Sequence, residues 1–380
     1  MILDKDIASS HQWAHRAPEG WHLALASYYQ TPENDTSKKH VEKTAVIVPI
    51  HNEERSLESF LNALMVADLS PEAAIRFLFI TNACQDQSPT IIRKFLGSVD
   101  KRADTIQTPP IVTDPNVDSE IFEARVGNTS LLHLNTQTKG KANALRLGNE
   151  LAIQSGHPIA MSVDANVYPE ANALQKLYDS SSEAIVDQPE SGIVVIHGSP
   201  YREHRATLYS QLVLKNKRGA KPSPEVKDLS NVNGWMLGWD TNWFKTIEDR
   251  IQVAVEDYAI GLLARVEGYH TLKVPDIKIW GYKGSTLRDD FRERVRAMRG
   301  MMQLMGLEPD LEDKILQENV NMRPLSQRFE ALVGRLSKNP ARTMLQILNF
   351  GLYEAALLQA RREFEVDPNN QSWPEIASSK

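Results

Sequence analysis

Four pairs of acidic and amide side chains follow or begin the most apolar segments of the chain. The pairs are Asn52 with Glu53, Asn82 with Asp86, Asp164 with Asn166, and Glu256 with Asp257. Their oxygens can accept hydrogen bonds from ribose and base, and they can ligate a hard divalent cation that also contacts phosphate. Carboxylates in the first turn of a helix, as at Glu256, are also favoured simply because they face the positive end of the helix dipole.

The segments around these pairs have the patterns of buried strands followed by helices. Apolar runs that predict strands are Thr44–Ile50, Arg76–Thr81, Ser130–Asn135 and Pro158–Val163. Helical spacing follows, for example from Lys139 to Gln154. This alternation predicts an α/β fold with a mostly parallel sheet and helices on both faces. Because parallel strands end at the same edge of a sheet, we expect the polar pairs to meet there.

The pattern also divides the chain. Residues 1–43 are predicted to be an N-terminal extension and linker, residues 44–284 the α/β core, residues 285–365 a helical C-terminal region, and residues 366–380 a polar tail. Within the core, the polar and proline-bearing residues 97–128 predict an insertion or a long loop. Residues 215–224 have the composition of a second loop.

Composition excludes several classes of protein. The 380 residues carry a net charge of −6, which argues against a general binder of nucleic acid or anionic membranes, although a local basic patch can still hold phosphate. The single cysteine, Cys84, excludes an internal disulfide and a cysteine-rich zinc site. No signal peptide and no membrane span are evident. We therefore expect a cytoplasmic protein, with peripheral association with a membrane left open.

In their order along the chain, these motifs resemble those of the inverting nucleotide-sugar glycosyltransferases of family 2, which have the GT-A fold. The matching segments are Val46-Ile-Val-Pro-Ile-His-Asn-Glu-Glu54, Thr81-Asn-Ala-Cys-Gln-Asp86, Lys139-Gly-Lys-Ala-Asn-Ala144, Asp164-Ala-Asn166, Glu256-Asp257 and Arg294-Val-Arg-Ala-Met-Arg-Gly300. The resemblance covers roughly residues 44 to 300. It implies a Rossmann-like GT-A core that moves a sugar from a UDP- or GDP-sugar to an acceptor hydroxyl with inversion.

The resemblance also implies where the donor binds. Pro49 and Glu53 would lie at the nucleotide with Asp86, while Asn52 and Asn82 shape the turns. Asparagine and aspartate after strands are, however, also ordinary turn formers. Lys139 precedes a helix whose N-terminal amides attract phosphate, and a lysine is slightly unfavourable there unless an anion is bound.

A divalent metal and a general base complete the implied chemistry. Asp164 ends a buried strand, and Mg²⁺ or Mn²⁺ bridging to the diphosphate would explain a carboxylate there. The family has a second aspartate where this chain has Asn166, which brings no charge. Three alternatives follow: weaker metal binding, a metal that needs the phosphates of the nucleotide, or no metal. Asp257 is the predicted general base for the acceptor hydroxyl, and Glu256 is predicted to orient it.

Arginines of the following helix and two tryptophans are the remaining candidates. Arg288, Arg292, Arg296 and Arg299 recur at helical spacing, and Arg296 with Arg299 is predicted to clamp the diphosphate. The interleaved acidic residues would equally suit a surface of salt bridges. Trp235 and Trp239 are predicted to stack on the acceptor, with core packing as the alternative. Ala297 stands where polymerising family members have tryptophan, which favours a single or limited transfer.

Two other functions stay open from the sequence. Asn166 and the missing tryptophan are compatible with a non-catalytic protein that binds nucleotide sugars or acts as a scaffold. A sugar-phosphate nucleotidyltransferase has a similar sheet, but its first loop is rich in glycine and arginine, unlike His51-Asn-Glu-Glu54. The partners expected are the nucleotide-sugar donor and an unknown acceptor, which can be a saccharide, a lipid or a small molecule. Nucleic acid is not expected.

Overall fold

A computed structural model of the chain describes most of the predicted core and the helices after it. The described residues are 44–65, 75–100, 104–107, 117, 120–126, 129–204, 226–227, 232, 234–283, 286–319, 322–334, 336 and 340–369. The predicted N-terminal extension and the predicted loop 215–224 lie outside these residues. So does the greater part of the predicted polar tail.

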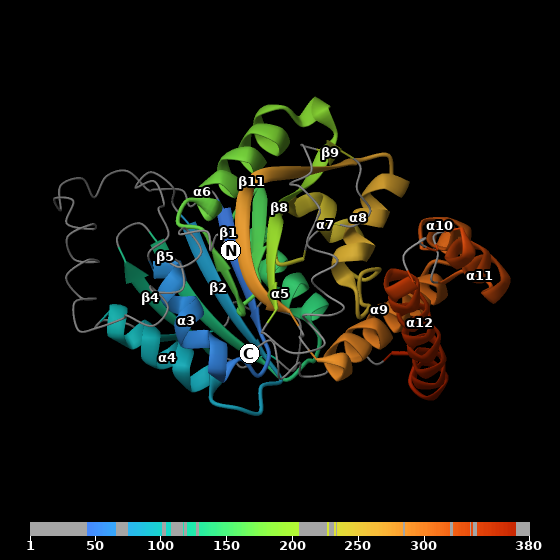
Figure 1. Cartoon of the computed structure of the whole chain (residues 1–380). Coiled ribbons are helices and arrows are strands. Elements are labelled where there is room, and N and C mark those ends of the chain that lie inside the picture. Colours follow the sequence, from blue (N-terminus) through green and yellow to red (C-terminus); the bar gives the residue numbers. More distant parts are fainter. Residues whose placement is uncertain are drawn as a thin grey trace, which may run out of the picture.

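In the residues that the structure describes, one sheet of eleven strands organises the core (Figure 1). The strands are β1 (Thr44–Ile50), β2 (Ile75–Asn82), β3 (Asp104–Gln107), β4 (Glu120–Val126), β5 (Thr129–Thr136), β6 (Ile159–Val163), β7 (Val167–Pro169), β8 (Ile193–His204), β9 (Val226–Lys227), β10 (Met236–Asp240) and β11 (His270–Lys283). Their spatial order is β3-β4-β5-β2-β1-β6-β10-β8-β11-β7, with β9 paired to β11.

The α/β prediction is confirmed, but the sheet is mixed rather than mostly parallel, since six of the ten strand pairings in the described residues are antiparallel. Strands β5, β2, β1 and β6 pair in parallel, as expected from the alternating pattern, and β8 pairs in parallel with β11. The other pairings, including β10 with β6 and β4 with β5, are antiparallel. The prediction of a long loop over residues 97–128 is wrong in part, because β3 and β4 form an antiparallel extension of the sheet there.

Helices cover both faces of the sheet. They are α3 (Glu54–Met65), α4 (Ser88–Val99), α5 (Lys141–Gln154), α6 (Ala173–Ser181), α7 (Thr241–Ile247) and α8 (Glu256–Val266). Successive residues of β1 alternate between the two faces: Ala45 and Ile47 pack with α5, α7 and α8, whereas Val46 and Val48 pack with α3, α4 and α6. All four side chains are fully buried. Burial on both faces explains why the central strands are continuously apolar rather than alternating.

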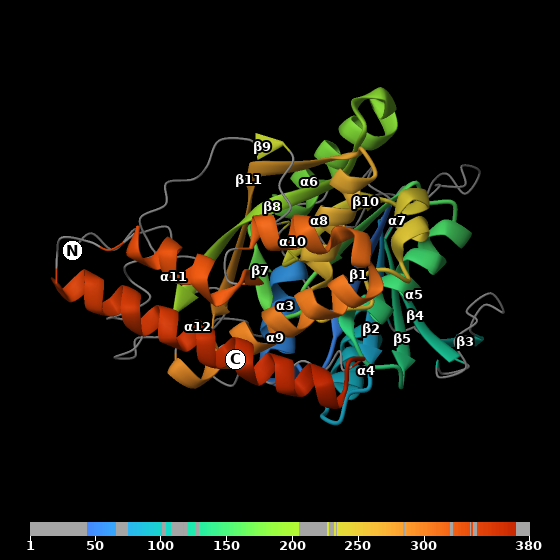
Figure 2. The same ribbon diagram turned by 90° about the vertical axis from the view of Figure 1, so that its right-hand side faces the viewer.

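A group of helices follows the sheet and lies to one side of it (Figures 1 and 2). These are α9 (Leu287–Leu307), α10 (Glu312–Glu318), α11 (Leu325–Val333) and α12 (Pro340–Val366). The long α12 packs along α9 through a separate apolar cluster that includes Val295, Met298 and Leu357. This cluster contains no residue of the sheet, so α12 is held to the core through α9.

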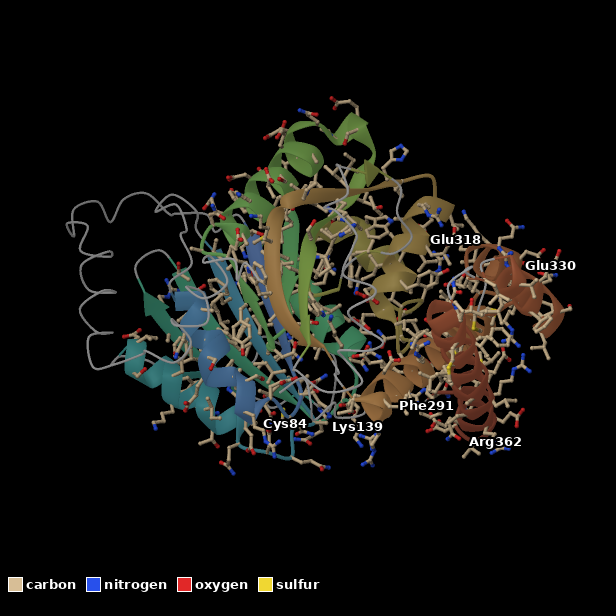
Figure 3. The ribbon with its side chains drawn as sticks, in the orientation of Figure 1. Cys84, Lys139, Phe291, Glu318, Glu330 and Arg362 are labelled. Carbon is tan, nitrogen blue, oxygen red and sulfur yellow. The ribbon has the colours of Figure 1, made fainter. Side chains whose placement is uncertain are left out.

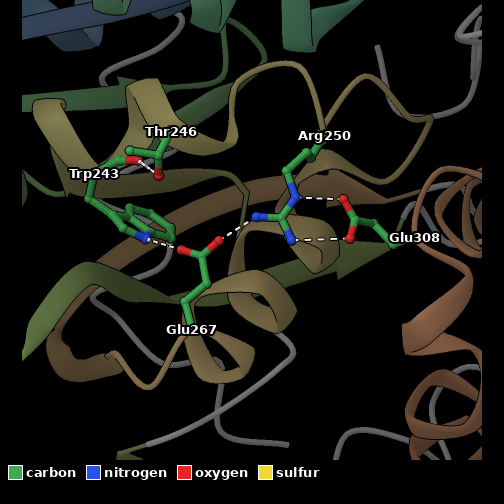
Figure 4. Close-up of polar contacts among 5 residues, drawn as sticks. All are labelled: Trp243, Thr246, Arg250, Glu267 and Glu308. Carbon is green, nitrogen blue, oxygen red and sulfur yellow. Dashed lines mark hydrogen bonds and ion pairs between the residues drawn. The ribbon is translucent and has the colours of Figure 1, made fainter.

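An arginine joins the end of α9 to the core (Figure 4). Arg250 donates to Glu308, just after α9, from Nε at 2.5 Å and from its terminal nitrogen at 3.1 Å, and it also pairs with Glu267, just after α8. Trp243 Nε1 donates to the other oxygen of Glu267 at 3.0 Å. The position of α9 against α8 is therefore fixed by a bidentate ion pair at its C-terminal end.

Glycine 148 tests the packing of α5 on the sheet. A Cβ atom there would lie 2.6–2.7 Å from three side-chain atoms of Ile47. We predict that Gly148→Ala destabilises the protein by about 1–3 kcal/mol through overpacking. Gly97→Ala in α4 is the matched control, because nothing lies within 4 Å of its added Cβ, and it should gain up to about 1 kcal/mol of helix propensity. Urea unfolding followed by circular dichroism measures both, and an unchanged midpoint for Gly148→Ala would show that Ile47 yields.

Candidate active site

The carboxyl ends of four parallel strands bring the predicted polar groups to one edge of the sheet. Strands β1, β2, β5 and β6 run in the same direction and lie side by side. The loops after them carry Asn52 and Glu53, Asn82 and Asp86, Lys139, and Asp164 with Asn166. Cys84 and Lys139 mark this edge below the sheet in Figure 3, whereas Glu330 and Arg362 mark the C-terminal helices beside it.

The loops after β1 and β2 are joined to each other by hydrogen bonds. Asp86 accepts hydrogen bonds from the backbone N–H of Glu54 through one carboxylate oxygen and of Ser88 through the other, both at 3.0 Å. Glu54 in turn accepts from the N–H of Gln87 at 3.1 Å, and the Ser88 hydroxyl accepts from the N–H of Glu53 at 2.9 Å. Side chains of each loop thus bind N–H groups at or just before the start of the other loop's helix, α3 or α4, and Asp86 also binds the first N–H of its own helix, α4.

Asparagine side chains complete these turns. Asn52 has a positive φ of 54° and its Oδ1 accepts from the N–H of Gln85 at 2.8 Å. Asn82 is buried and its Nδ2 donates to the carbonyl oxygen of Gly140 at 2.8 Å. Ala83 is left-handed at φ 50° and its N–H donates to the Thr136 carbonyl at 2.7 Å. The predicted turn role of both asparagines agrees with these contacts, and Asp86 also serves the loops rather than projecting from them.

The cysteine of the second loop is not a nucleophile in this state. Its Sγ contacts the carbonyl oxygen of Ile50 at 3.4 Å, and burial raises the pKa of the Cys84 thiol to about 11. The thiol is therefore protonated near neutral pH, so chemistry that needs a thiolate is not supported at Cys84.

Glutamate 53 links the first loop to the loop after β6. Its Oε1 accepts a hydrogen bond from Asn166 Nδ2 at 3.2 Å, and its Oε2 accepts from the Ser56 hydroxyl at 2.7 Å. Two of the predicted binding motifs, far apart in the sequence, are thus in direct contact. Pro49 lies half-buried within β1 opposite Ile80, and Lys139 is exposed in the turn before α5.

A buried lysine occupies the centre of the site. Lys141, the first residue of α5, places its Nζ 2.7 Å from Asp164 Oδ1 and 3.0 Å from Glu256 Oε1. The same ammonium donates to the carbonyl oxygen of Gly234 at 2.9 Å. The three charged residues are each less than a tenth exposed. Lys141 therefore joins α5, the end of β6, the start of α8 and the segment before β10.

The backbone of Gly234 connects this ion cluster to the predicted base. While its carbonyl accepts from Lys141, its N–H donates to Asp257 Oδ2 at 3.2 Å, and Asp257 Oδ1 accepts from the N–H of Tyr258 at 2.9 Å. A Cβ at position 234 would lie 2.8 Å from the Asp257 side chain, so only glycine fits. Asp257 itself is partly exposed, unlike Glu256. It is the carboxylate of this cluster that a solute can reach more readily.

Burial and charge oppose each other in this cluster. Burial raises the pKa of the Asp164 and Glu256 carboxyl groups, and the Lys141 ammonium lowers both. Burial works against the charge of Lys141, but Asp164 and Glu256 raise its pKa above the ordinary value. The ammonium thus remains charged, whereas the pKa of both carboxyl groups stays above the ordinary value because burial outweighs the attraction of the lysine.

Helix α9 turns only part of its arginine face toward the site. Arg296 lowers the pKa of both Asp164 and Glu256, so its guanidinium lies within electrostatic reach of the cluster. Arg299, predicted to share this role, is instead buried and pairs with Glu363 of α12 at 3.0 Å. That prediction is corrected, because α12 covers this part of α9 and engages the guanidinium. Arg294 is likewise buried between the helices, with its guanidinium 3.9 Å above the centre of the Tyr353 ring.

The two candidate acceptor tryptophans have different surroundings. Trp239 is fully buried in the core, stacks on Phe244, and donates from Nε1 to Asn149 at 3.0 Å. Its predicted contact with an acceptor is therefore wrong, because β10 is an interior strand covered on both faces. Trp235 is partly exposed, and its ring lies so close to Gly281 of β11 that a Cβ there would meet it at 2.8 Å. Trp235 remains the candidate for acceptor contact.

The predicted metal ligands do not fit a resident divalent ion. One oxygen of Asp164 is bound by an ammonium, whose charge would repel a second cation, and Asn166 supplies only a neutral amide. Within the described residues, no group of three or more His, Cys, Asp or Glu side chains is placed to hold a metal. An ion bound here would need most of its ligands from phosphate and water.

Two central residues, Lys141 and Gly234, were not among the predicted site residues, although Lys141 carries a sequence signal. It is spaced at helical intervals from Ala144, Leu145 and Gly148, which places it on the buried face of α5. A lysine on such a face needs an acidic partner. No pattern distinguishes Gly234, since the need for glycine arises from a close approach between segments that are far apart in sequence.

Comparisons with known proteins give only distant likeness. No family model matches the chain, and no curated protein matches it in sequence. Among solved structures, the mannosyltransferase PcManGT from Pyrobaculum calidifontis, in complex with GDP-Man and Mn²⁺, is 15% identical over 97% of this chain and 86% of its own, with a TM-score of 0.43. TarS of S. aureus is 18% identical over 86% of this chain and 54% of its own, also with a TM-score of 0.43. TarS 1-349 in complex with UDP-GlcNAc is 16% identical over 88% and 95%, with a TM-score of 0.42. With likeness this low, any functional assignment has to come from the residues of the site.

Replacing Lys141 tests whether its ammonium stabilises the buried carboxyl groups of Asp164 and Glu256. Lys141→Met leaves two buried carboxylates without their cation, and we predict a loss of about 3–5 kcal/mol at neutral pH. A carboxyl whose pKa is raised by folding stabilises below its ordinary pKa, about 4, and that stability is lost as pH rises through the raised value. Removing Lys141 raises these pKa values further, so the variant loses more stability than the parent as pH rises. The difference in the free energy of unfolding between variant and parent should therefore shrink as pH falls toward the ordinary pKa of a carboxyl group.

The matched control is Lys139→Met, which changes an exposed lysine two residues earlier and should shift stability by no more than about 0.5 kcal/mol. Chemical unfolding of the three proteins at several pH values gives the comparison. A loss of stability of the same size at every pH would contradict a charge interaction between Lys141 and the carboxyl groups of Asp164 and Glu256.

Proposed function

We propose that this protein is a glycosyltransferase, which moves a sugar from a UDP- or GDP-sugar to an acceptor hydroxyl with inversion. The observation that supports this most is the cluster of Lys141, Asp164, Glu256 and Asp257 at the carboxyl edge of the parallel strands. Motifs that match family 2 glycosyltransferases in sequence order are brought together there. The edge where parallel strands end is also the usual place for ligands in α/β sheets.

The nucleotide would lie on the two interlocked loops. Glu53 is half-buried and joined to Asn166, so we propose that it faces the ribose or base. The diphosphate would lie between the first turn of α5, with Lys139 beside it, and Arg296 of α9. An arginine suits this position because its guanidinium can donate two hydrogen bonds to a phosphate. The loops already have their left-handed turns, so little rearrangement is needed when the donor binds.

Asp257 is the proposed general base. It would accept the proton of the acceptor hydroxyl as that oxygen bonds to the anomeric carbon, and the bond from that carbon to the diphosphate would break on the opposite side. The nucleoside diphosphate leaves with the electron pair, and no covalent sugar-enzyme intermediate is needed. Glu256 is buried under Lys141 and would hold the base in place through Gly234 rather than take the proton.

Two other functions are weaker alternatives. A protein that binds nucleotide sugars without catalysis would need no base, yet Asp257 is partly exposed and held by two backbone N–H groups. A nucleotidyltransferase is disfavoured because its first loop is rich in glycine and arginine. Here that loop is His51-Asn-Glu-Glu54.

Asp257→Asn tests the base. We predict that this variant binds donor nucleotide as the parent does and loses about 10²- to 10⁴-fold in turnover, the usual contribution of a general base. Asp249→Asn, on the exposed surface after α7, should keep its turnover. Release of nucleoside diphosphate from a panel of nucleotide sugars, with a mixture of acceptors, measures both variants. Equal turnover in Asp257→Asn would assign the base to another group.

Measurements of thermal stability distinguish binding of the donor nucleotide from binding of the metal. We predict that UDP or GDP raises the unfolding temperature and that Mg²⁺ or Mn²⁺ adds to this effect only when the nucleotide is present, because Asp164 and Asn166 do not form a resident site. Thermal shift with each component alone and together gives the answer. Stabilisation by the metal alone would contradict the arrangement at Lys141, and failure of every nucleoside diphosphate to bind would remove the proposed function.

A further inference from the structure

Helix α9 lies very close to the segment that leads into the proposed base. A Cβ atom at Gly300 would lie 2.6 Å from Val255 Cγ2 and 2.9 Å from the backbone nitrogen of Val255. Both distances are well below van der Waals contact, so only glycine permits this separation. Because glycine weakens the interior of a helix, its presence in α9 needs a reason of this kind. Val255 directly precedes Glu256 and Asp257, so the contact lies next to the ion cluster.

A buried hydrogen bond joins the same two segments one turn further along α9. Gln303 Oε1 accepts from the backbone N–H of Ala254 at 2.9 Å, and Gln303 Nε2 donates to the carbonyl oxygen of Pro368 at 2.9 Å. Ala254 is fully buried and Gln303 is nearly so. Since a buried N–H without an acceptor is costly, this bond holds the segment before α8 at one position along α9. The glycine contact sets how far apart the two segments are, and the hydrogen bond sets how they are aligned.

The same side of α9 carries Arg296. It precedes Gly300 by four residues and Gln303 by seven, and these intervals place the three side chains along one side of a helix. Gly300 and Gln303 contact the residues just before α8. The guanidinium of Arg296 acts on the carboxyl groups of Asp164 and Glu256, and it lowers the pKa of both. The arginine that reaches the ion cluster is therefore one helical turn from the close contact.

Val255 is the residue from which α8 begins. Its carbonyl oxygen accepts from the N–H of Ala259 at 3.1 Å, which is a hydrogen bond of the first turn. Glu256 and Asp257 are the next two residues and belong to the same turn. A displacement of Val255 relative to α9 would therefore change the distance from Arg296 to both carboxylates.

We propose that Gly300 and Gln303 are positioning residues, which set the distance between the guanidinium of Arg296 and the carboxylate of Asp257. This role rests on the proposed function, in which Arg296 contacts the diphosphate and Asp257 takes the proton of the acceptor. The anomeric carbon lies between these two groups in such a transfer, so their separation has to match the sugar diphosphate. A misplacement of about 1 Å can lower turnover about 100-fold. A contact with no room for a methyl group fixes a distance with that accuracy.

A double-mutant cycle between Gly300 and Arg296 tests the proposal. Titration calorimetry of the full chain with inorganic diphosphate, UDP and GDP gives the affinities. We expect Arg296→Gln to weaken binding about tenfold, which is the usual contribution of a hydrogen bond to a charged group. Gly300→Ala should weaken binding about threefold or more in the parent and should have no further effect in the Arg296→Gln background, because a guanidinium that is absent cannot be displaced.

Gln303→Met supplies a second variant, which decides the matter if Gly300→Ala does not fold. It keeps a side chain of similar length and removes the oxygen that binds the N–H of Ala254. Its effect on the affinity for diphosphates should likewise disappear in the Arg296→Gln background. Turnover, measured by release of nucleoside diphosphate, should fall by up to about 100-fold in both variants, because Asp257 is displaced as well.

Two other glycines provide the controls. A Cβ at Gly306, in the last turn of α9, would meet only Phe364 at 3.9 Å, which is an ordinary contact. A Cβ at Gly238 in β10 would meet Ser181 Oγ at 2.5 Å, so Gly238→Ala is as crowded as Gly300→Ala but lies away from α9. Both alanine variants should bind every diphosphate as the parent does. Gly238→Ala thereby separates a loss of affinity from a loss of stability through overpacking.

Several outcomes would overturn the proposal. Losses that simply add in the cycle, or unchanged binding in both Gly300→Ala and Gln303→Met, would give these residues a packing role and leave the proposed function intact. If the parent binds inorganic diphosphate but neither UDP nor GDP, the proposed function fails, and the cycle with inorganic diphosphate still shows whether Gly300 positions Arg296. A parent that binds none of the three ligands would overturn both.

Discussion

The bond between one ammonium group and two buried carboxylates holds the site together. Lys141 comes from the start of α5, Asp164 from the end of β6 and Glu256 from the start of α8. An unpaired charge in this position would cost several kcal/mol, so none of the three elements can shift without exposing the others to that cost. Because Gly234 accepts from the same ammonium, the position of Asp257 also depends on Lys141. Through this cluster, the packing of the sheet determines where the partly exposed carboxylate of Asp257 lies.

Backbone groups position most of the remaining polar side chains. In the first two loops, Asp86, Glu54 and Ser88 each accept a hydrogen bond from a backbone N–H of the other loop or of its helix. Since N–H groups at the start of a helix have no partner within it, these contacts stabilise α3 and α4 and fix the loops together. Polar residues in a binding region therefore need not touch a ligand to matter, because they determine the shape on which the ligand would rest.

Sequence patterns predicted the layers of the fold better than the geometry of the site. Strands such as β1 and β6 are recognisable because burial on both faces demands continuous apolar residues, and the polar groups that follow them mark the edge where they end. The antiparallel hairpin of β3 and β4 was missed since its residues are mixed in polarity. Trp239 and Arg299 were misplaced for a common reason: whether a side chain faces solvent depends on neighbours supplied by distant segments, β8 and β6 in one case and α12 in the other. Contacts of this kind have no local signature.

Helix α9 belongs to two environments at once. Arg296 lies within electrostatic reach of the ion cluster, while Val295, Met298 and Met302 pack under α12. Because α12 packs on α9 and α9 carries Arg296, a shift of α9 caused by α12 would change the distance between Arg296 and the ion cluster. Thermodynamic reciprocity then applies: if occupation of the C-terminal helices changes the affinity of the site for an anion, the anion must change the affinity of those helices by the same factor.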